Sequence, residues 1–179
     1  MDKKYQLLVS DTIRVNDQTL YRIQALRDIP GVVKKGDLGG YIASESNLSH
    51  NGKCWVWDNA KVFDNAQVND NARVSGHAWI CDNAHVSGNA RVYGCAWIGD
   101  NAWIGDNAQI SDYAQIFNNA QVSGKVQVSG YAQVGGDMKI RGKIQLGGNI
   151  ILIGQFKLHS KEEQKIEVKS PVYVGGIEL

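Results

Sequence analysis

Aliphatic residues recur at every sixth position through the middle of the chain, from Val56 to Leu152. The seventeen members are Val56, Val62, Val68, Val74, Ile80, Val86, Val92, Ile98, Ile104, Ile110, Ile116, Val122, Val128, Val134, Ile140, Leu146 and Leu152. Four residues after each of them comes a second small or apolar residue, usually Ala, and a polar pair such as Asp-Asn or Gly-Asn lies between. A period of six fits neither an amphipathic helix nor simple strand alternation, so the pattern indicates a repeat architecture.

Each unit predicts a short strand and a corner. Ala60 and Val62 are two residues apart, which places both side chains on one face of a strand, and the polar pair before Ala60 then forms the corner. Asn tolerates the left-handed backbone conformation, so we expect a positive φ at the second corner residue, for example Asn59. We also expect amide ladders between coils from the outward glutamines, which are Gln109, Gln115, Gln121, Gln127, Gln133 and Gln145.

The number of units in one coil follows from how the corners vary. At the second corner position, His77, Cys95, Tyr113 and Tyr131 replace Asn, and they lie eighteen residues apart. Residues that stack should vary together, so this spacing predicts three units per coil in a triangular prism. It places Ile98 inside the prism and puts Trp79 and Trp97 on the same side.

The repeat resembles a known family. Units such as Ile98-Gly99-Asp100-Asn101-Ala102-Trp103 resemble the hexapeptide repeat of left-handed parallel β-helix proteins, which include many acyltransferases and the γ-class carbonic anhydrases. This resemblance covers roughly residues 54 to 156. It implies an all-β fold, a left-handed parallel β-helix with three hexapeptides per coil and about six coils, but it does not carry a function with it.

The two ends of the chain predict caps. Residues 1–28 alternate as strands around an Asn16-Asp17 bend, which favours a β-hairpin. Ile42 and Leu48 predict an irregular first coil, set off from the clean register by two extra residues near Gly52. We therefore divide the chain into an N-terminal β cap and lead-in (1–53), the β-helix (54–159) and a short C-terminal β cap (160–179), in which the charged run 160–165 predicts a solvated exit loop.

A second resemblance covers nearly the whole chain. The Tyr-Arg-Ile strand at 21–23, the Lys-Gly-Asp-Leu-Gly-Gly segment at 35–40 and Cys-Trp-Val at 54–56 occur in an order similar to that of the YdcK-like proteins. These are uncharacterised bacterial and prophage proteins that are classed as transferases on fold grounds. The resemblance implies the same fold and cap, and it names no reaction.

One side of the predicted prism is apolar. It collects an aromatic set with a cysteine, which we predict to be an interface: Phe63, Trp79, Cys81, Trp97 and Phe117. Stacked Trp residues are costly on a surface that faces water, so we expect a partner copy or a terminal segment to cover them. Hexapeptide-repeat proteins commonly form trimers, which makes a homotrimer the favoured assembly.

Charge and cysteine content limit the partners. With 19 Lys plus Arg against 18 Asp plus Glu, the chain has a formal net charge of +1, so we expect neither nucleic acid nor a membrane as its partner. We expect neither a leader nor a membrane-spanning segment. Cys54, Cys81 and Cys95 have no disulfide or metal spacing, which suits reduced thiols in a cytoplasm.

The candidate chemistry is sparse. His77, at a corner, and His85, on a side, are the candidates for a general base, although both also suit ordinary turn and surface positions. A zinc site of the carbonic anhydrase type needs three converging histidines, and the four here are scattered, so we expect no metal. The Asp residues at the first corner position are typical turn residues and do not indicate a calcium site.

The sequence therefore favours a non-catalytic scaffold or binding module that self-associates through its aromatic side and needs no cofactor. One alternative is an acyltransferase that uses acetyl-CoA at a site between subunits, near His77 or His85. Another, from the prophage resemblance, is a protein that binds and blocks a host factor. Calorimetry with acetyl-CoA separates the first two of these hypotheses.

Overall fold

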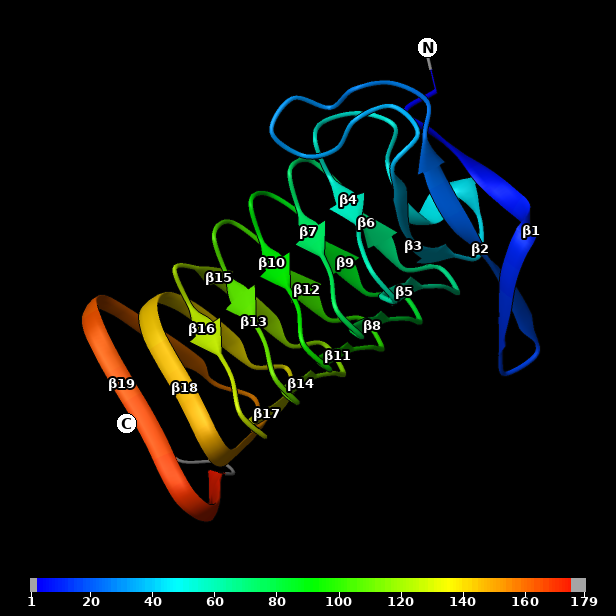
Figure 1. Cartoon of the computed structure of the whole chain (residues 1–179). Coiled ribbons are helices and arrows are strands. Elements are labelled where there is room, and N and C mark those ends of the chain that lie inside the picture. The colour runs from blue at the N-terminus through cyan, green and yellow to red at the C-terminus, as the bar shows by residue number, and fades with distance from the viewer. Residues whose placement is uncertain (1–2, 175–179) are drawn as a thin grey trace.

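The chain folds as a parallel β-solenoid of about 7 turns. The structure, a computed structural model, describes residues 3–174, and of residues 168–174 only the backbone. Figure 1 shows the turns stacked in a row from the blue N-terminal hairpin to β18 and β19 at the opposite end. The solenoid predicted from the sequence is confirmed, whereas its left-handedness stays a prediction from the resemblance.

The solenoid has three sides, each built from strands that pair in parallel with the strands one turn before and after. The first side holds β4 (Trp55–Val56), β7 (Arg73–Val74), β10 (Arg91–Val92), β13 (Gln109–Ile110) and β16 (Gln127–Val128). The second side holds β5 (Lys61–Val62), β8 (Trp79–Ile80), β11 (Trp97–Ile98), β14 (Gln115–Ile116) and β17 (Gln133–Gly136). The third side holds β6 (Gln67–Val68), β9 (His85–Val86), β12 (Trp103–Ile104) and β15 (Gln121–Gly124). The strands β18 (Lys139–Gly154) and β19 (Lys157–Val174) pass along all three sides.

The register of eighteen residues is confirmed. Trp97 pairs with Trp79 in one direction and with Gln115 in the other, so the two Trp residues do lie on one side. Ile98 and Ile80 pair in the same ladder, and both side chains are 0% exposed. The column of aliphatic residues thus fills a dry interior, and the burial of this apolar surface is the main contribution to stability.

The corners differ from the prediction in one respect. The residue with a positive φ is the first corner residue, such as Asp58 (φ 54°) or Gly76 (φ 68°), and not the Asn that follows it. Glycine adopts this conformation without a steric penalty, and Asp tolerates it better than most residues, which explains why those two types alternate at this position. The second corner Asn has a different role, because its side chain joins successive coils: Asn83 Nδ2 donates to Asn101 Oδ1 at 3.3 Å.

The predicted glutamine ladders are wrong. Within residues 3–167, no side-chain hydrogen bond links the outward glutamines Gln109 to Gln133 to one another, and Gln145 donates to Glu163 instead. The amide ladders form at the corners, among shorter Asn side chains. A Gln side chain on an open strand face has more rotamer freedom to lose, and water can satisfy its amide equally well.

The N-terminal region forms a hairpin and an irregular lead-in coil, as predicted. The strands β1 (Tyr5–Val15) and β2 (Gln18–Ala25) pair antiparallel, and β2 pairs with β3 (Leu38–Ile42), which is followed by the short helix η1 (Glu45–Asn47). Ile42 pairs with Val62, a spacing of two residues more than the eighteen of the body. This confirms the two extra residues near Gly52.

The C-terminal region differs from the predicted exit loop. Residues 160–165 belong to β19, which continues the parallel ladder with β18. Two register shifts absorb the extra residues: Ile144 pairs with Gln164, and Ile150 with Val172. The charged run is therefore a bulge in an ordered strand. The predicted cap segment ends at residues 175–179, which lie outside the described residues.

Candidate functional site

The second side of the solenoid carries a row of aromatic side chains. Trp79 is 36% exposed, whereas Trp97 and Phe117 are partly buried, and the Trp97 and Phe117 ring centroids are 6.4 Å apart. A Cβ atom on Gly99 would overlap the Trp97 ring, so this indole packs onto the glycine two residues later. We refer to Trp79, Trp97 and Phe117 as the aromatic strip.

The chain covers part of this side with its own hairpin. Val15 and Leu20, near the hairpin turn, pack in a small cluster with Phe63 and Cys81, and these last two side chains are 4% and 5% exposed. Gln18, in the same turn, donates to a carboxylate oxygen of the solenoid at 2.6 Å. Of the two covers expected for this side, a terminal segment therefore covers Phe63 and Cys81. Trp97 packs against this cluster and is partly buried, whereas Trp79 stays exposed.

The two candidate histidines do not form one site. His77 lies at the corner between the first and second sides, and His85 lies in β9 on the third side. Both are exposed. The Nδ1 atom of His85 contacts the Asn83 carbonyl oxygen at 2.9 Å, a local contact with the preceding corner. Neither histidine lies in the pockets described below for Arg73 and Lys139, and the general-base role stays a prediction.

One cluster has the donor set of a metal site. The carboxylates of Asp64 and Asp82 and the thiol of Cys81 lie within 4.8 Å of one another. Their oxygens already accept hydrogen bonds, however: Asp64 Oδ2 from the Asp82 N–H at 3.2 Å, and Asp82 Oδ2 from the Cys81 thiol at 3.1 Å. Burial and the bond to Asp82 raise the pKa of Cys81, so the sulfur is held as a thiol, which is a poor metal ligand. We infer that these three residues stabilise the corners of the solenoid through their hydrogen bonds.

The first side has a small groove. Arg73 and Arg91 are register partners, and a hollow of about 350 Å³ lies beside them between Trp57 and Tyr93. The Arg73 guanidinium lies 6.0 Å from the centre of the Trp57 ring, which is a cation–π contact.

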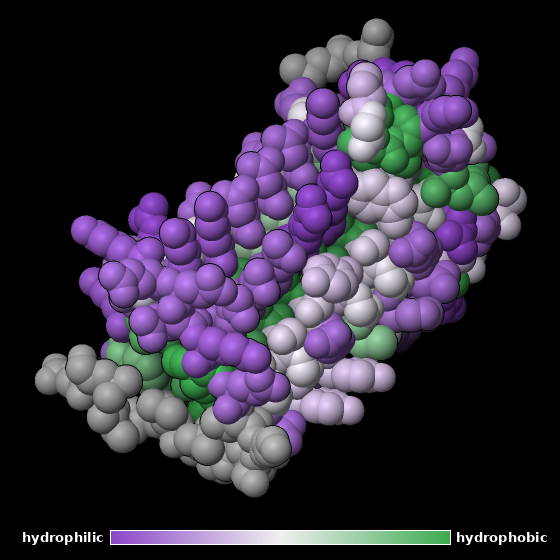
Figure 2. Space-filling model, turned by 60° about the vertical axis from the view of Figure 1, so that its left-hand side comes forward, coloured by the Kyte–Doolittle hydropathy of each residue, from purple (hydrophilic) through white to green (hydrophobic). Residues whose placement is uncertain are grey.

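Figure 2 shows how polar the exterior is on the face that it presents: hydrophilic side chains cover much of it, beside a band of near-neutral residues.

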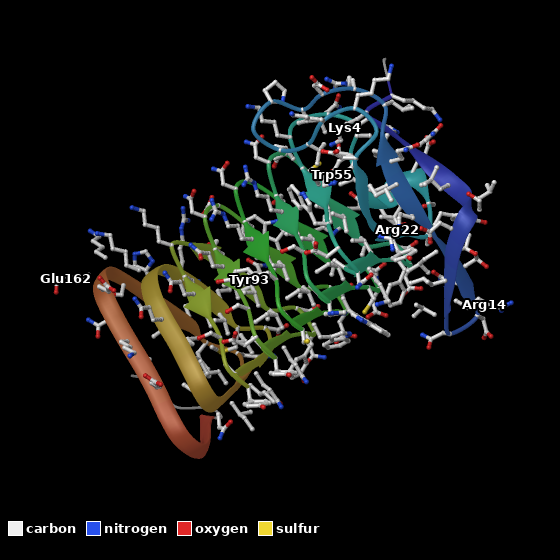
Figure 3. All side chains as sticks on the ribbon, in the orientation of Figure 1. Lys4, Arg14, Arg22, Trp55, Tyr93 and Glu162 are labelled. Carbon is white, nitrogen blue, oxygen red and sulfur yellow. The ribbon has the colours of Figure 1, made fainter. Side chains whose placement is uncertain are left out.

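A buried lysine lies at the N-terminal end, and no pattern in the sequence predicts it. Lys4 is 0% exposed, and its Nζ donates to the Cys54 carbonyl at 2.8 Å and contacts the Cys54 thiol at 3.2 Å. Burial lowers the pKa of Lys4. Figure 3 shows Lys4 beside Trp55, where the chain closes the open end of the solenoid. The lysine satisfies backbone carbonyls that have no coil above them, and its role is structural.

No protein-family model matches the chain, and a search of the curated proteins finds none that is similar. The family resemblances therefore rest on the residues quoted for them, and the parallel β-solenoid is the description that the structure supports. Among the described residues, no helix has the length and apolar character needed to span a membrane.

Proposed function

We propose that this chain is a rigid, non-catalytic binding module that self-associates through the aromatic strip. The observation that carries the proposal is the register pairing of Trp79 with Trp97 on an open sheet face. Aromatic side chains with little conformational freedom dominate the energy of protein interfaces. Here the backbone ladder fixes the two Trp residues on neighbouring strands, whose backbones lie about 4.8 Å apart, so little entropy is lost when a partner covers them.

The apolar surface extends beyond the two Trp residues. Phe117 continues the strip by one coil, and Ile153, two coils further along the same side, is 42% exposed. The hairpin bounds the strip at the other end, because it occupies the position over Phe63. A second copy would contact a straight apolar band that the hairpin limits at one end. This limit favours one relative orientation of the two copies. A homotrimer is the assembly proposed from the resemblance to hexapeptide-repeat proteins.

The regular body supports the non-catalytic half of the proposal. The pairing offset is constant from Trp55 to Gly142, so no long loop leaves the solenoid there to cover a substrate. An acyltransferase alternative would need a general base from one copy and an acetyl-CoA groove shared with another. Calorimetry tests it: heat of binding from acetyl-CoA would favour the enzyme, and capture of one host protein would favour the host-factor alternative.

The experiment for self-association is a solution mass measurement by light scattering coupled to gel filtration. We expect the wild-type chain to elute as an oligomer and the Trp79→Ser/Trp97→Ser variant to elute at lower mass with its fold intact. Trp103→Ser is the matched control, because Trp103 packs onto Gly105 as Trp97 packs onto Gly99 but lies on the third side. A monomeric wild type, or an unchanged mass in the double variant, would refute the interface.

A further inference from the structure

Cationic side chains gather at the C-terminal end of the third side and at the corner next to it. They come from β18 and β19 and, in the case of Lys125, from the turn after β15. We call them the basic strip, which comprises Lys125, Lys139, Arg141, Lys143, Lys157 and Lys161. In Figure 3, side chains that end in nitrogen project from the corner where β18 and β19 turn, near the labelled Glu162.

The ladder holds these charges against one another. Lys139 pairs with Lys157, and Arg141 pairs with His159, so both of these positions in β18 have another basic residue directly opposite. Like charges in this arrangement repel. The ion pairs found within residues 3–167 include none of the basic strip. An anion bound along the strip would remove that repulsion.

The strip borders two adjoining hollows. One cavity of about 450 Å³ is lined by Lys139, Arg141 and Lys157, and a second of about 420 Å³ is lined by the corner lysines. The two share the lining residues Asp106, Arg141 and His159, so they adjoin at the edge of the solenoid, and we refer to the two together as the channel. Asp106 is the single carboxylate that lines them among the described residues, and its Oδ2 already accepts the Gly124 N–H at 3.0 Å.

An aromatic ring lies at the inner end of this channel. Trp103 lines the first cavity together with Lys139 and Arg141, and it is partly exposed. Its ring packs against Gly105, where a Cβ atom would overlap it, and this contact fixes the indole on the sheet face. A fixed indole beside a cationic channel is the combination by which proteins hold single strands of nucleic acid, with the backbone on the cations and a base on the ring.

We propose that the basic strip and Trp103 bind single-stranded nucleic acid. The net charge of +1 led to the opposite expectation, because it sums over the whole chain and hides the separation of charge along the solenoid. An anionic membrane would favour a flat basic surface, whereas this one is a channel with an aromatic wall. The site lies on a different side from the aromatic strip and does not depend on self-association.

The experiment measures fluorescence anisotropy of a labelled single-stranded oligonucleotide of about 12 nucleotides, with the full chain, over a series of salt concentrations. We expect saturable binding that weakens as salt rises. Lys139→Gln/Lys157→Gln should lower affinity roughly tenfold or more and reduce the slope of log K against log salt by about 1.4, for two lost phosphate contacts. Trp103→Leu should lower affinity roughly tenfold and leave the slope unchanged.

The matched control is Arg73→Gln/Arg91→Gln, which removes the same charge from a register-paired position on the first side. It should bind as the wild type does, and a cooperative urea transition in every variant shows that the fold is retained. Equal loss in the two double variants, or no binding at low salt, overturns the proposal. So does equal or tighter binding of a duplex or of phosphatidylserine vesicles, which would assign the strip to another polyanion.

Discussion

The carboxylate of Asp82 accepts a hydrogen bond from the backbone N–H of Asp100, one coil further along, at 3.0 Å. Asp100 repeats the contact with the N–H of Asn118 at 2.8 Å. Both Asp residues have a positive φ, near 57° and 54°. The first corner residue therefore does two things: it makes the turn, and its side chain satisfies an amide that points along the solenoid axis.

Substitutions at Asp100 should separate these two roles. Asp100→Ala loses the hydrogen bond to the Asn118 N–H. It also leaves alanine at φ 54°, a conformation that alanine adopts only at a steric cost. We therefore expect it to lower the free energy of unfolding by about 1–3 kcal/mol. Asp100→Gly loses only the bond and should cost less. Urea denaturation of both variants checks the order. A larger loss for Gly than for Ala would contradict the assignment of the turn to this residue.

The interior column gives a second prediction. Ile98→Asn places an amide without a partner where the side chain is 0% exposed, and it should lower the free energy of unfolding by roughly 3–5 kcal/mol. Ile98→Val is the control, because it removes one methylene and should cost about 0.5–1.5 kcal/mol. Thermal or urea unfolding measures both. A fully stable Ile98→Asn variant would mean that this position does not face the interior.

Alkaline pH should destabilise the N-terminal end. Burial raises the pKa of Tyr5, so the phenol ionises more readily in the unfolded chain than in the folded one. Its stabilising effect is complete below the usual pKa of 10.0 and is lost as the pH rises above that value, by at most about 1.4 kcal/mol per pH unit. Tyr5→Phe should reduce this loss, as measured by urea denaturation across the alkaline range. The exposed Tyr131→Phe is the control, and an equal effect in both variants would contradict the prediction.

The repeat makes the body of the fold predictable, because every six-residue unit repeats the same short strand and corner. The spacing of His77, Cys95 and Tyr113 was enough to set the register, and it is confirmed by the stacked Tyr113 and Tyr131 rings, whose centroids are 5.1 Å apart. The error at the corners was avoidable. Gly76 and its equivalents occupy the first corner position, and they marked the residue that needs a positive φ.

The remaining features depend on contacts that no local pattern records. The hairpin folds back over Phe63 because residues more than forty positions apart, such as Leu20 and Phe63, pack together. The charged run in β19 predicts a loop, because composition does not reveal that a bulged strand can hold these residues. The basic strip was missed because net charge averages over Lys139, Lys157 and the acidic corners of other coils.

A disulfide test of the register examines the central claim most directly. In a Cys95→Ser background, Gln109→Cys and Gln127→Cys occupy register partners whose Cα atoms should be about 4.8 Å apart, within the range that a disulfide spans. Gln109→Cys with Gln121→Cys is the control, because Gln121 lies on the third side. After mild oxidation, we predict that mass spectrometry of the digested protein finds the 109–127 bridge in high yield and little 109–121 bridge. Equal yields, or a preference for 109–121, would contradict a three-sided solenoid with eighteen residues per turn.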